Sequence, residues 1–308
     1  MARPLVSVVM PVHAGERWLD AALATITSTA DAPVEVIIRD SSPTGSCEAI
    51  VQRHAGRLQI DYLHMPEVAS WTRKTNLAVE AARGEHIAML HQDDFWLPGR
   101  LAVVAEMIAQ DRDAALLVTS ACIVDDSGRA LGRWRPPFAS GEVANDACRD
   151  GLLVQNSIAI PAPVFRRDAY LAVGGLDESL WYTPDWDLWL KLAARGRVLY
   201  DPRPTVAFRV HGGSLTMTGD RREFAEQLEI VLARHLPAAS KIAPICRASA
   251  RINVLLAQAA DGRPARAIAA ALGTMLALGP RAIVRYIHAS RIVERVTPRL
   301  RARLSGVF

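Results

Sequence analysis

Two adjacent carboxylates, Asp93 and Asp94, come directly after the apolar run 87–90 and the pair His91-Gln92. A buried strand has no structural need for two acids at its tip. A divalent cation such as Mg²⁺ or Mn²⁺, in contrast, takes oxygen ligands and leaves coordination positions open for phosphate oxygens. The alternative is that one of the acids caps the helix that follows or lies in a solvated turn.

Three further polar residues stand at the ends of predicted elements. Asp40 follows an apolar strand, where a carboxylate can hydrogen-bond a nucleotide base or ribose. Asp185 falls in the first turn of a helix beside Trp186 and Trp189, where it could act as a general base next to an aromatic surface. His211 precedes two glycines and is a candidate metal ligand beside a carboxylate site. Taken singly, each is more often a turn, helix-terminal or surface residue.

Alternating strands and helices must position these residues. Apolar runs rich in β-branched residues predict strands at 6–10, 34–38, 60–63, 86–90 and 116–124. Helical periodicity lies between them and includes helices over 72–82 and 97–110. The alternation predicts an α/β fold with βαβ units and a parallel sheet, so that ligands would bind beyond the carboxyl ends of the strands.

The second half of the chain is less regular. Its patterns predict a strand running into a helix over 164–173, a helix over 185–194, and two short strands at 198–200 and 206–210. The segment 133–137, with two prolines, is expected to interrupt any element.

Composition narrows the function classes. Half of the 308 residues are apolar, and no run is long enough to span a bilayer. The four cysteines are scattered without a C-x-x-C pair, which argues against a structural zinc site or a disulfide framework and favours reduced thiols in a cytoplasmic protein. The first apolar run, 5–12, is interpreted as a strand and not as a signal peptide. Neither a dinucleotide-binding glycine motif nor a P-loop is present.

The charge is distributed unevenly. Residues 240–308 contain twelve basic and two acidic residues, a net charge of +10, which leaves −6 for residues 1–239. Basic residues three and four apart predict a basic amphipathic helix, namely Arg281, Arg285, His288, Arg291 and Arg295. This helix would lie on an anionic membrane, or it would pack on the enzyme or a partner as part of a helical hairpin. The uncharged stretch 267–278 is typical of a packed helix. Nucleic acid is not expected as a partner, because only Tyr286 interleaves the arginines.

Taken in order, these motifs resemble the inverting family 2 glycosyltransferases of GT-A fold. The resemblance runs from residue 5 to Ser214 and rests on motifs in the family's order. They are the first strand ending Pro11-Val12, the strand ending Arg39-Asp40-Ser41-Ser42, Asn76 with Ala82-Arg83-Gly84-Glu85, His91-Gln92-Asp93-Asp94 at the D-x-D position, Gly174-Gly175-Leu176-Asp177-Glu178, Asp185-Trp186-Asp187-Leu188-Trp189-Leu190 and Arg209-x-His211-x-x-Ser214.

The resemblance implies roles for individual residues. Asp185 would be the catalytic base, and Asp93 would bind Mg²⁺ or Mn²⁺ with His211 and, in the place of the family's first Asp, His91. The donor would be a nucleotide sugar, with UDP or dTDP as the expected nucleotide. The residues expected to contact it are Pro11, His13, Glu16, Asp40, Lys74, Asn76, Gln92 and Asp93.

Three positions depart from the family's pattern. His91 replaces the first Asp of D-x-D, which changes the expected metal affinity and leaves a ribose contact as its alternative role. Pro184 replaces the Glu before the base, but proline suits the first position of a helix and keeps Asp185 in the first turn. Ala14 replaces a common Asn after the first strand, at the expense of one nucleotide contact.

The sequence therefore predicts a GT-A domain over residues 1–235, with a central, mostly parallel sheet flanked by helices, and a basic helical C-terminal extension over 236–308. The expected activity is metal-assisted transfer of a sugar to a glycan or lipid-linked acceptor for a cell-surface glycan. The expected place is the cytoplasm, including the inner face of the cytoplasmic membrane. The alternatives are a non-catalytic nucleotide-sugar-binding protein of the same fold and a sugar-nucleotide nucleotidyltransferase, which would need a glycine- and arginine-rich loop in place of 11–15.

Overall fold

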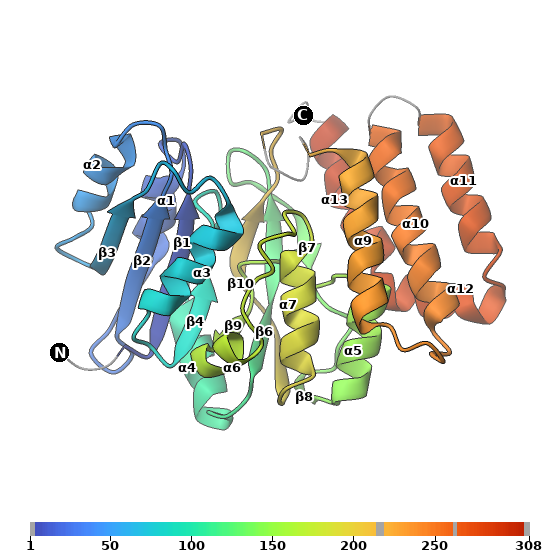
Figure 1. Ribbon diagram of the computed structural model, residues 1–308, viewed down its shortest axis with the longest axis horizontal. Helices are drawn as coiled ribbons and strands as arrows, with labels where there is room; N and C mark the ends of the chain where they lie inside the picture. The colour runs from blue at the N-terminus through green and yellow to red at the C-terminus, as the bar shows by residue number, and fades with distance from the viewer. Residues whose placement is uncertain (1–3, 214–218, 261–263, 305–308) are drawn as a thin grey trace.

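The computed structural model describes residues 4–213, 219–260 and 264–304 (Figure 1). Within them, ten strands form one sheet in the order β3-β2-β1-β4-β9-β6-β10-β5, with β7 added beside β6 and β8 beside β10. The strands are β1 Val6–Val12, β2 Val34–Asp40, β3 Gln59–His64, β4 His86–Met89, β5 Phe95–Trp96, β6 Leu116–Val124, β7 Ala130–Trp134, β8 Gly141–Val143, β9 Val164–Arg166 and β10 Val198–Arg209.

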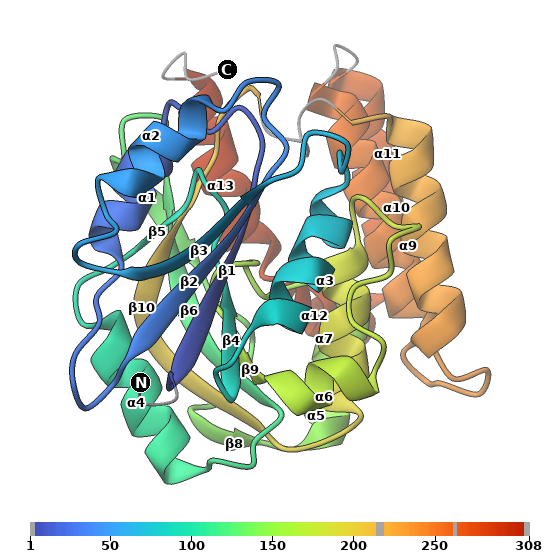
Figure 2. The ribbon, with the colours of Figure 1, turned by 60° about the vertical axis from the view of Figure 1, so that its left-hand side comes forward.

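Helices cover both faces of this sheet (Figure 2). Helices α1, α2 and α4 share one apolar core with one face, and α3, α5 and α7 share a second core with the other. The helices are α1 Leu19–Thr25, α2 Ser46–Gln52, α3 Trp71–Ala81, α4 Arg100–Gln110, α5 Asn145–Val154, α6 Arg167–Ala172, α7 Pro184–Ala193, α9 Arg221–His235, α10 Ala243–Ala260, α11 Pro264–Leu276, α12 Pro280–Ser290 and α13 Ile292–Leu304.

The sheet brings six carboxyl ends to one edge. Strands β3, β2, β1 and β4 are parallel to one another, and β10 is parallel to β6. Strand β9 is antiparallel to both β4 and β6, so these two point the same way. The carboxyl ends of β1, β2, β3, β4, β6 and β10 therefore lie along the same edge, where ligands bind in open α/β sheets.

The sheet is mixed, and the predicted parallel arrangement holds for β1, β2, β3, β4, β6 and β10. The short strands β5, β7, β8 and β9 pair antiparallel. Strand β7 forms where the prolines of 133–137 were expected to interrupt any element, because the strand ends at Trp134, before them. The two short strands at 198–200 and 206–210 are one strand, β10, whose register shifts between Asp201 and Val206.

The C-terminal helices do not form a separate core. Ile242, Cys246, Ile252 and Tyr286 belong to the same buried cluster as Trp189 of α7, and Tyr286 is fully buried. Helix α9 ends at His235, and the division of the chain between residues 235 and 236 stays a prediction. The described part of 236–308 thus packs on the α5–α7–α9 side of the molecule. No single described helix is long and apolar enough to cross a membrane.

Candidate active site

Asp40 is held at the carboxyl end of β2. Its side chain is fully buried, and its Oδ1 accepts hydrogen bonds from the Ser42 amide at 2.8 Å and the Ser42 hydroxyl at 2.6 Å. The Tyr62 hydroxyl donates to Oδ2 at 2.9 Å. Sequence reasoning missed Tyr62, although alternating exposure along β3 places every second residue of that strand inward.

Lys74 joins the ends of β1 and β2. Helix α3 starts at a Ser70 cap whose hydroxyl accepts from the Arg73 amide at 3.3 Å, and this places Lys74 against the sheet. Its ammonium donates to the Val12 carbonyl and to the Ser41 hydroxyl, each at 2.6 Å. Burial lowers the pKa of Lys74 to about 8, although the charge of Asp40 opposes the shift.

Gln92 ties β4 to the end of β1. Its Oε1 accepts from the His13 amide and its Nε2 donates to the His13 carbonyl, both at 2.7 Å. His13 itself is exposed, with Nδ1 2.9 Å from the Ser41 carbonyl oxygen. Exposed Glu16 accepts a hydrogen bond from the Ser46 hydroxyl, which lowers the pKa of its carboxyl group. Pro11 is a buried residue of β1, one position before the strand ends at Val12. Its expected contact with the donor stays a prediction.

Asp93 and His211 lie side by side. His211 Nε2 is 2.9 Å from Asp93 Oδ2, and Arg209 Nε donates to the Asp93 carbonyl at 2.8 Å. The Trp18 ring lies 4.5 Å from the His211 ring. Burial alone would raise the pKa of Asp93, but the His211 hydrogen bond and the nearby His91 outweigh it and lower the pKa. Asp94 has a different duty, because its buried carboxylate accepts from the Arg209 amide at 2.9 Å.

The donor atoms of Asp93 and His211 fit one divalent ion. Adjacent ligands of an octahedral ion at about 2.1 Å lie about 3.0 Å apart, close to the 2.9 Å between these atoms. His91 lies nearby, with its ring centroid 5.2 Å from that of Trp71 and its buried Nε2 without a hydrogen-bond partner in the described structure. No group of three or more His, Cys, Asp or Glu side chains able to hold a metal occurs among the described residues. Remaining coordination positions would have to come from substrate and water oxygens.

Asp185 stands in the first turn of α7, as predicted. Its Oδ2 accepts from Asn156 Nδ2 at 2.9 Å and its Oδ1 from the Trp186 amide at 2.8 Å. Burial raises the pKa of Asp185 to about 6, against the effect of both hydrogen bonds. Asn156, which follows α5, is a site residue that sequence reasoning missed, because nothing in the spacing connects it to residue 185.

Trp71 lies between the segment of His91 and the loop that leads to Asp185. It contacts His91 on one side, and its indole donates to the Trp181 carbonyl at 3.0 Å on the other, four residues before Asp185. Asn76, in contrast, is not brought to the strand ends. Its amide donates to the Leu176 carbonyl at 3.0 Å and to Glu178 at 2.8 Å, so that it fastens α3 to the loop 174–178.

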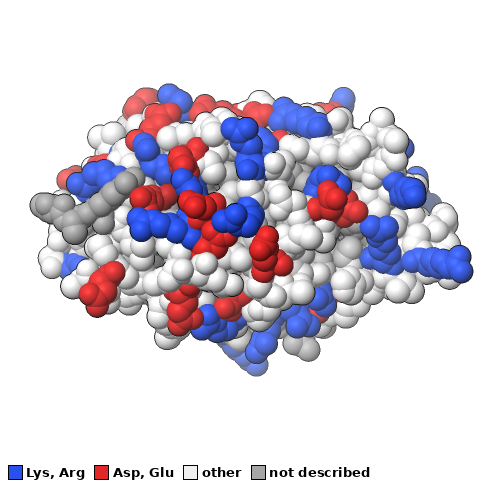
Figure 3. Space-filling view, turned by 90° about the horizontal axis from the view of Figure 1, so that it is seen from below, with Lys and Arg blue, Asp and Glu red and all other residues white. Residues whose placement is uncertain are grey.

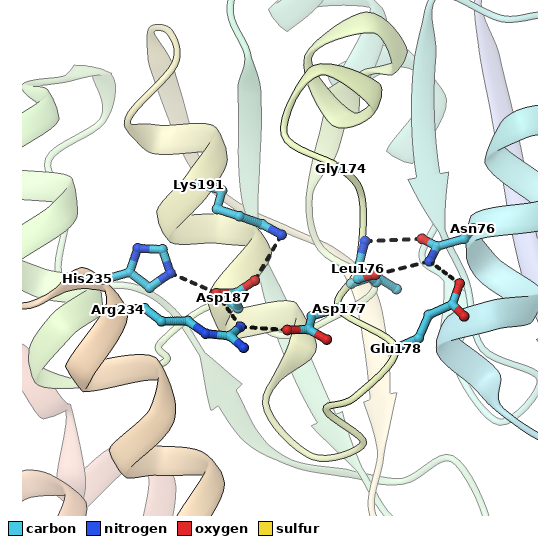
Figure 4. Close-up of a pocket in the computed structure, with 9 residues that line it drawn as sticks. All are labelled: Asn76, Gly174, Leu176, Asp177, Glu178, Asp187, Lys191, Arg234 and His235. Atoms are coloured by element: carbon cyan, nitrogen blue, oxygen red, sulfur yellow. Dashed lines mark hydrogen bonds and ion pairs between the residues drawn. The ribbon is translucent and has the colours of Figure 1, made fainter.

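That loop borders a separate open pocket of 520 Å³ between α3, α7 and α9 (Figure 4). Asp187 is buried there, with His235 Nε2 at 2.8 Å and Lys191 Nζ at 2.9 Å. Burial would raise the pKa of Asp187, but these two partners lower it to about 2. The acids of the pocket are already paired with its bases, so we interpret the cluster as the contact that fixes α7 to α9.

Comparison with known proteins assigns the family. Residues 7–235 match the family model described as glycosyltransferase like family 2, which covers more than half of the chain. The chain belongs to this family. The family resemblance found in the sequence is thereby confirmed. Ser214 of its last motif lies outside the described residues.

Relatives of this family 2 protein include a glycosyltransferase and a protein of O-antigen biosynthesis. An uncharacterized glycosyltransferase, MJ1057, from Methanocaldococcus jannaschii is 26% identical over 198 residues, which are 63% of this chain and 66% of that protein. The O-antigen biosynthesis protein RfbC from Myxococcus xanthus is 30% identical over 194 residues, 62% of this chain but 14% of RfbC. The chain thus matches about two thirds of the first protein and a small part of the second.

Solved structures show the same fold. S. aureus TarS 1-349 in complex with UDP-GlcNAc has a TM-score of 0.61 at 16% identity, covering 98% of this chain and 92% of that one. The mannosyltransferase PcManGT from Pyrobaculum calidifontis, in complex with GDP-Man and Mn²⁺, has a TM-score of 0.58 at 19% identity, covering 95% and 87%. The predicted GT-A fold with added C-terminal helices is confirmed.

Proposed function

We propose that this family 2 protein transfers a glycosyl group from a nucleoside-diphosphate sugar to an acceptor hydroxyl, with inversion at the anomeric carbon and Asp185 as the base. The observation that carries the proposal is the environment of Asp185. A carboxyl group with a pKa of about 6 is a competent proton acceptor near neutral pH. Asn156 holds its orientation, and the tryptophans of α7 stiffen the helix behind it.

In this reaction the acceptor oxygen attacks the anomeric carbon as its proton passes to an Asp185 oxygen. The bond from that carbon to the phosphate oxygen breaks, and the nucleoside diphosphate leaves with the bonding electrons. The sugar passes through an oxocarbenium-like transition state. A divalent ion bound by Asp93 and His211 would neutralise charge on the departing diphosphate.

The residues at the ends of β1 and β2 would bind the donor. Asp40 would accept a hydrogen bond from the nucleotide, and Lys74 would bring positive charge toward the phosphates. Gln92 would hold the first loop in place through the His13 backbone. UDP or dTDP remains the nucleotide we propose, and the UDP-GlcNAc complex of TarS agrees with the first of these.

The acceptor we propose is a glycan or a lipid-linked sugar in cell-surface glycan synthesis, as the name of RfbC suggests. Such an acceptor would place the enzyme in the cytoplasm, at or near the inner face of the cytoplasmic membrane.

Turnover of nucleotide sugars tests the proposal. Purified protein should cleave or transfer at least one common nucleotide sugar when Mn²⁺ or Mg²⁺ is present, and Asp185→Asn should lower kcat by about 100-fold or more. Asp168→Asn is a matched control, because Asp168 also lies in the first turn of a helix and accepts from the next amide, at 2.7 Å. Its turnover should stay at the wild-type level.

The non-catalytic alternative predicts a different result. A nucleotide-sugar-binding protein would show a thermal shift with its ligand but no turnover of any donor, and Asp185→Asn would change nothing. That outcome would refute the enzymatic proposal and leave the family membership untouched.

A further inference from the structure

Helix α11 lies at the end of the molecule farthest from β3 (Figure 1). Ile268, Leu272 and Leu276 are 45%, 50% and 67% exposed, and their spacing of four residues aligns them along one side of the helix. Ala267 and Ala271, one residue before Ile268 and Leu272 and therefore about 100° around the helix, are buried. The expectation that 267–278 is a packed helix therefore holds only for the side that carries these alanines.

The apolar surface continues onto α12. The chain bends by 118° between the two helices, and Val284 and Ile287 of α12 are 69% and 42% exposed. Arg266 of α11 and Arg281 of α12 are also exposed, and neither has an ion-pair partner in the described part of the chain. In Figure 3, the tip formed by these helices shows Lys and Arg atoms without Asp or Glu on the visible face.

Other arginines of the segment are already engaged within the protein. Arg285 pairs with Asp150 at 3.3 Å, Arg291 pairs with Glu294 at 3.2 Å, and Arg295 donates to Asn253 at 3.0 Å. The predicted basic face of 281–296 is thus largely directed toward neighbouring residues. Among the described arginines of α11 and α12, Arg266 and Arg281 are the two without an ion-pair partner, and both are exposed.

We propose that the outer face of α11, with the start of α12, is the docking surface for an anionic lipid bilayer. Ile268, Leu272 and Leu276 would insert between lipid head groups and bury area that water now contacts. Arg266 and Arg281 would lie at the level of the lipid phosphates, where each adds electrostatic attraction. This inference goes beyond glycosyl transfer and does not depend on it.

A second copy of the chain fits this surface less well. In a two-fold symmetric dimer the same patch meets itself, so Arg266 and Arg281 of one copy would approach those of the other. Residues 240–308 hold only two acids to offset twelve basic residues. Charge repulsion therefore opposes self-association at this face, whereas an anionic bilayer complements it.

Vesicle sedimentation of the full chain tests the proposal. We expect the wild type to bind vesicles of phosphatidylcholine with one quarter phosphatidylglycerol, and to bind pure phosphatidylcholine vesicles much more weakly. The triple variant Ile268→Ser, Leu272→Ser, Leu276→Ser should lower the partition coefficient by about ten-fold or more. The matched control changes Leu63, Leu171 and Ile230 to serine, three residues that are 48%, 43% and 40% exposed on other elements. It should bind as the wild type does.

The arginines give an independent readout. The double variant Arg266→Gln, Arg281→Gln should lose most of the salt dependence of binding, and Arg195→Gln, an exposed arginine elsewhere, should keep it. The proposal would be overturned if the wild type did not sediment with anionic vesicles, or if the triple variant bound them as well as the wild type does. A wild-type dimer that dissociates in the triple variant, without lipid binding, would assign the face to a second copy. Turnover of a water-soluble donor should be the same in all these variants, which separates this test from that of the proposed function.

Discussion

The two halves of the site are held in different ways. The donor half is the part that we propose binds the donor, at the ends of β1 and β2. Its side chains Asp40, Lys74 and Gln92 form hydrogen bonds with nearby backbone and side-chain groups. In the catalytic half, His91 Nε2 and Asn156 Oδ1 are buried and lack a hydrogen-bond partner within the described residues. The named side chains of the donor half are hydrogen-bonded within the protein, whereas the catalytic half has two buried polar atoms without a partner among the described residues.

This difference in hydrogen bonding predicts different effects of substitutions on folding stability and on turnover. Satisfied hydrogen bonds between strand ends fix the donor half before any ligand arrives. Buried polar atoms without partners cost free energy, about 1–3 kcal/mol each, unless a ligand or water satisfies them. We therefore expect substitutions in the catalytic half to change turnover with little effect on folding, and substitutions in the donor half to change donor binding and stability together.

The largest effect in this comparison is expected from Asp93. In Asp93→Asn the charge that would hold a divalent ion is lost, so kcat should fall by about 100-fold and the Mn²⁺ concentration for half-maximal activity should rise. Asp61→Asn, at an exposed acid on β3, should leave both values unchanged. An Asp93→Asn enzyme with wild-type kcat and metal requirement would remove Asp93 from the catalytic half.

Lys74→Met should act on the donor half. The KM for the donor should rise by about ten-fold, the value of one charge-assisted hydrogen bond, while kcat changes less. The loss also leaves the Val12 carbonyl and Ser41 hydroxyl without this donor. A change confined to kcat would place Lys74 with the catalytic residues instead.

The same variant has a signature in the pH dependence of stability. Because the pKa of Lys74 is lowered from 10.5 to about 8 in the folded protein, only the unfolded state binds this proton between pH 8 and pH 10.5. The free energy of unfolding should therefore rise with pH across that window. Denaturant titrations at several pH values should show a smaller rise in Lys74→Met than in the wild type.

Asn156→Ala tests how the catalytic half tunes its base. The lost hydrogen bond favours the charged form of Asp185, so its removal should raise the pKa of Asp185 further above 6. The acidic limb of kcat/KM should move up by about one pH unit, with turnover reduced several-fold near pH 6 and little changed near pH 8. Asn145→Ala, at the other end of α5, is the matched control and should keep the wild-type profile. A profile lowered equally at every pH would point to a packing role for Asn156.

In both halves, the sequence predicts some of the site residues and misses others. Asp40, Asp93 and Asp185 stand at strand ends and in a first helical turn, positions that local patterns determine. Tyr62, Trp71 and Asn156 reach the site from neighbouring elements, and their contacts depend on strand order and helix packing. The antiparallel β9, inserted between β4 and β6, was likewise hidden, because a three-residue strand carries too little periodicity to show its direction. Asn76 bonds the loop 174–178, which sequence order could not show because it does not reveal which side of α3 faces that loop. Its expected contact with the donor stays a prediction.

The smallest effect is expected from a substitution of Ala14, which lies in the loop that follows β1. Ala14 has a φ of +50°, and Ala14 and Arg291 are the only non-glycine residues with positive φ among those described. Asn tolerates this left-handed conformation better than Ala, whose strain there is about 1 kcal/mol. Ala14→Asn should therefore raise Tm by about 2 °C, since its amide hydrogen bond to Ser42 at 2.9 Å is kept. Ala69→Asn, at another exposed alanine, should not raise Tm. A gain in Tm together with a lower KM for the donor would show that this loop belongs to the donor half, whereas a gain in Tm alone would show that its backbone strain is independent of binding.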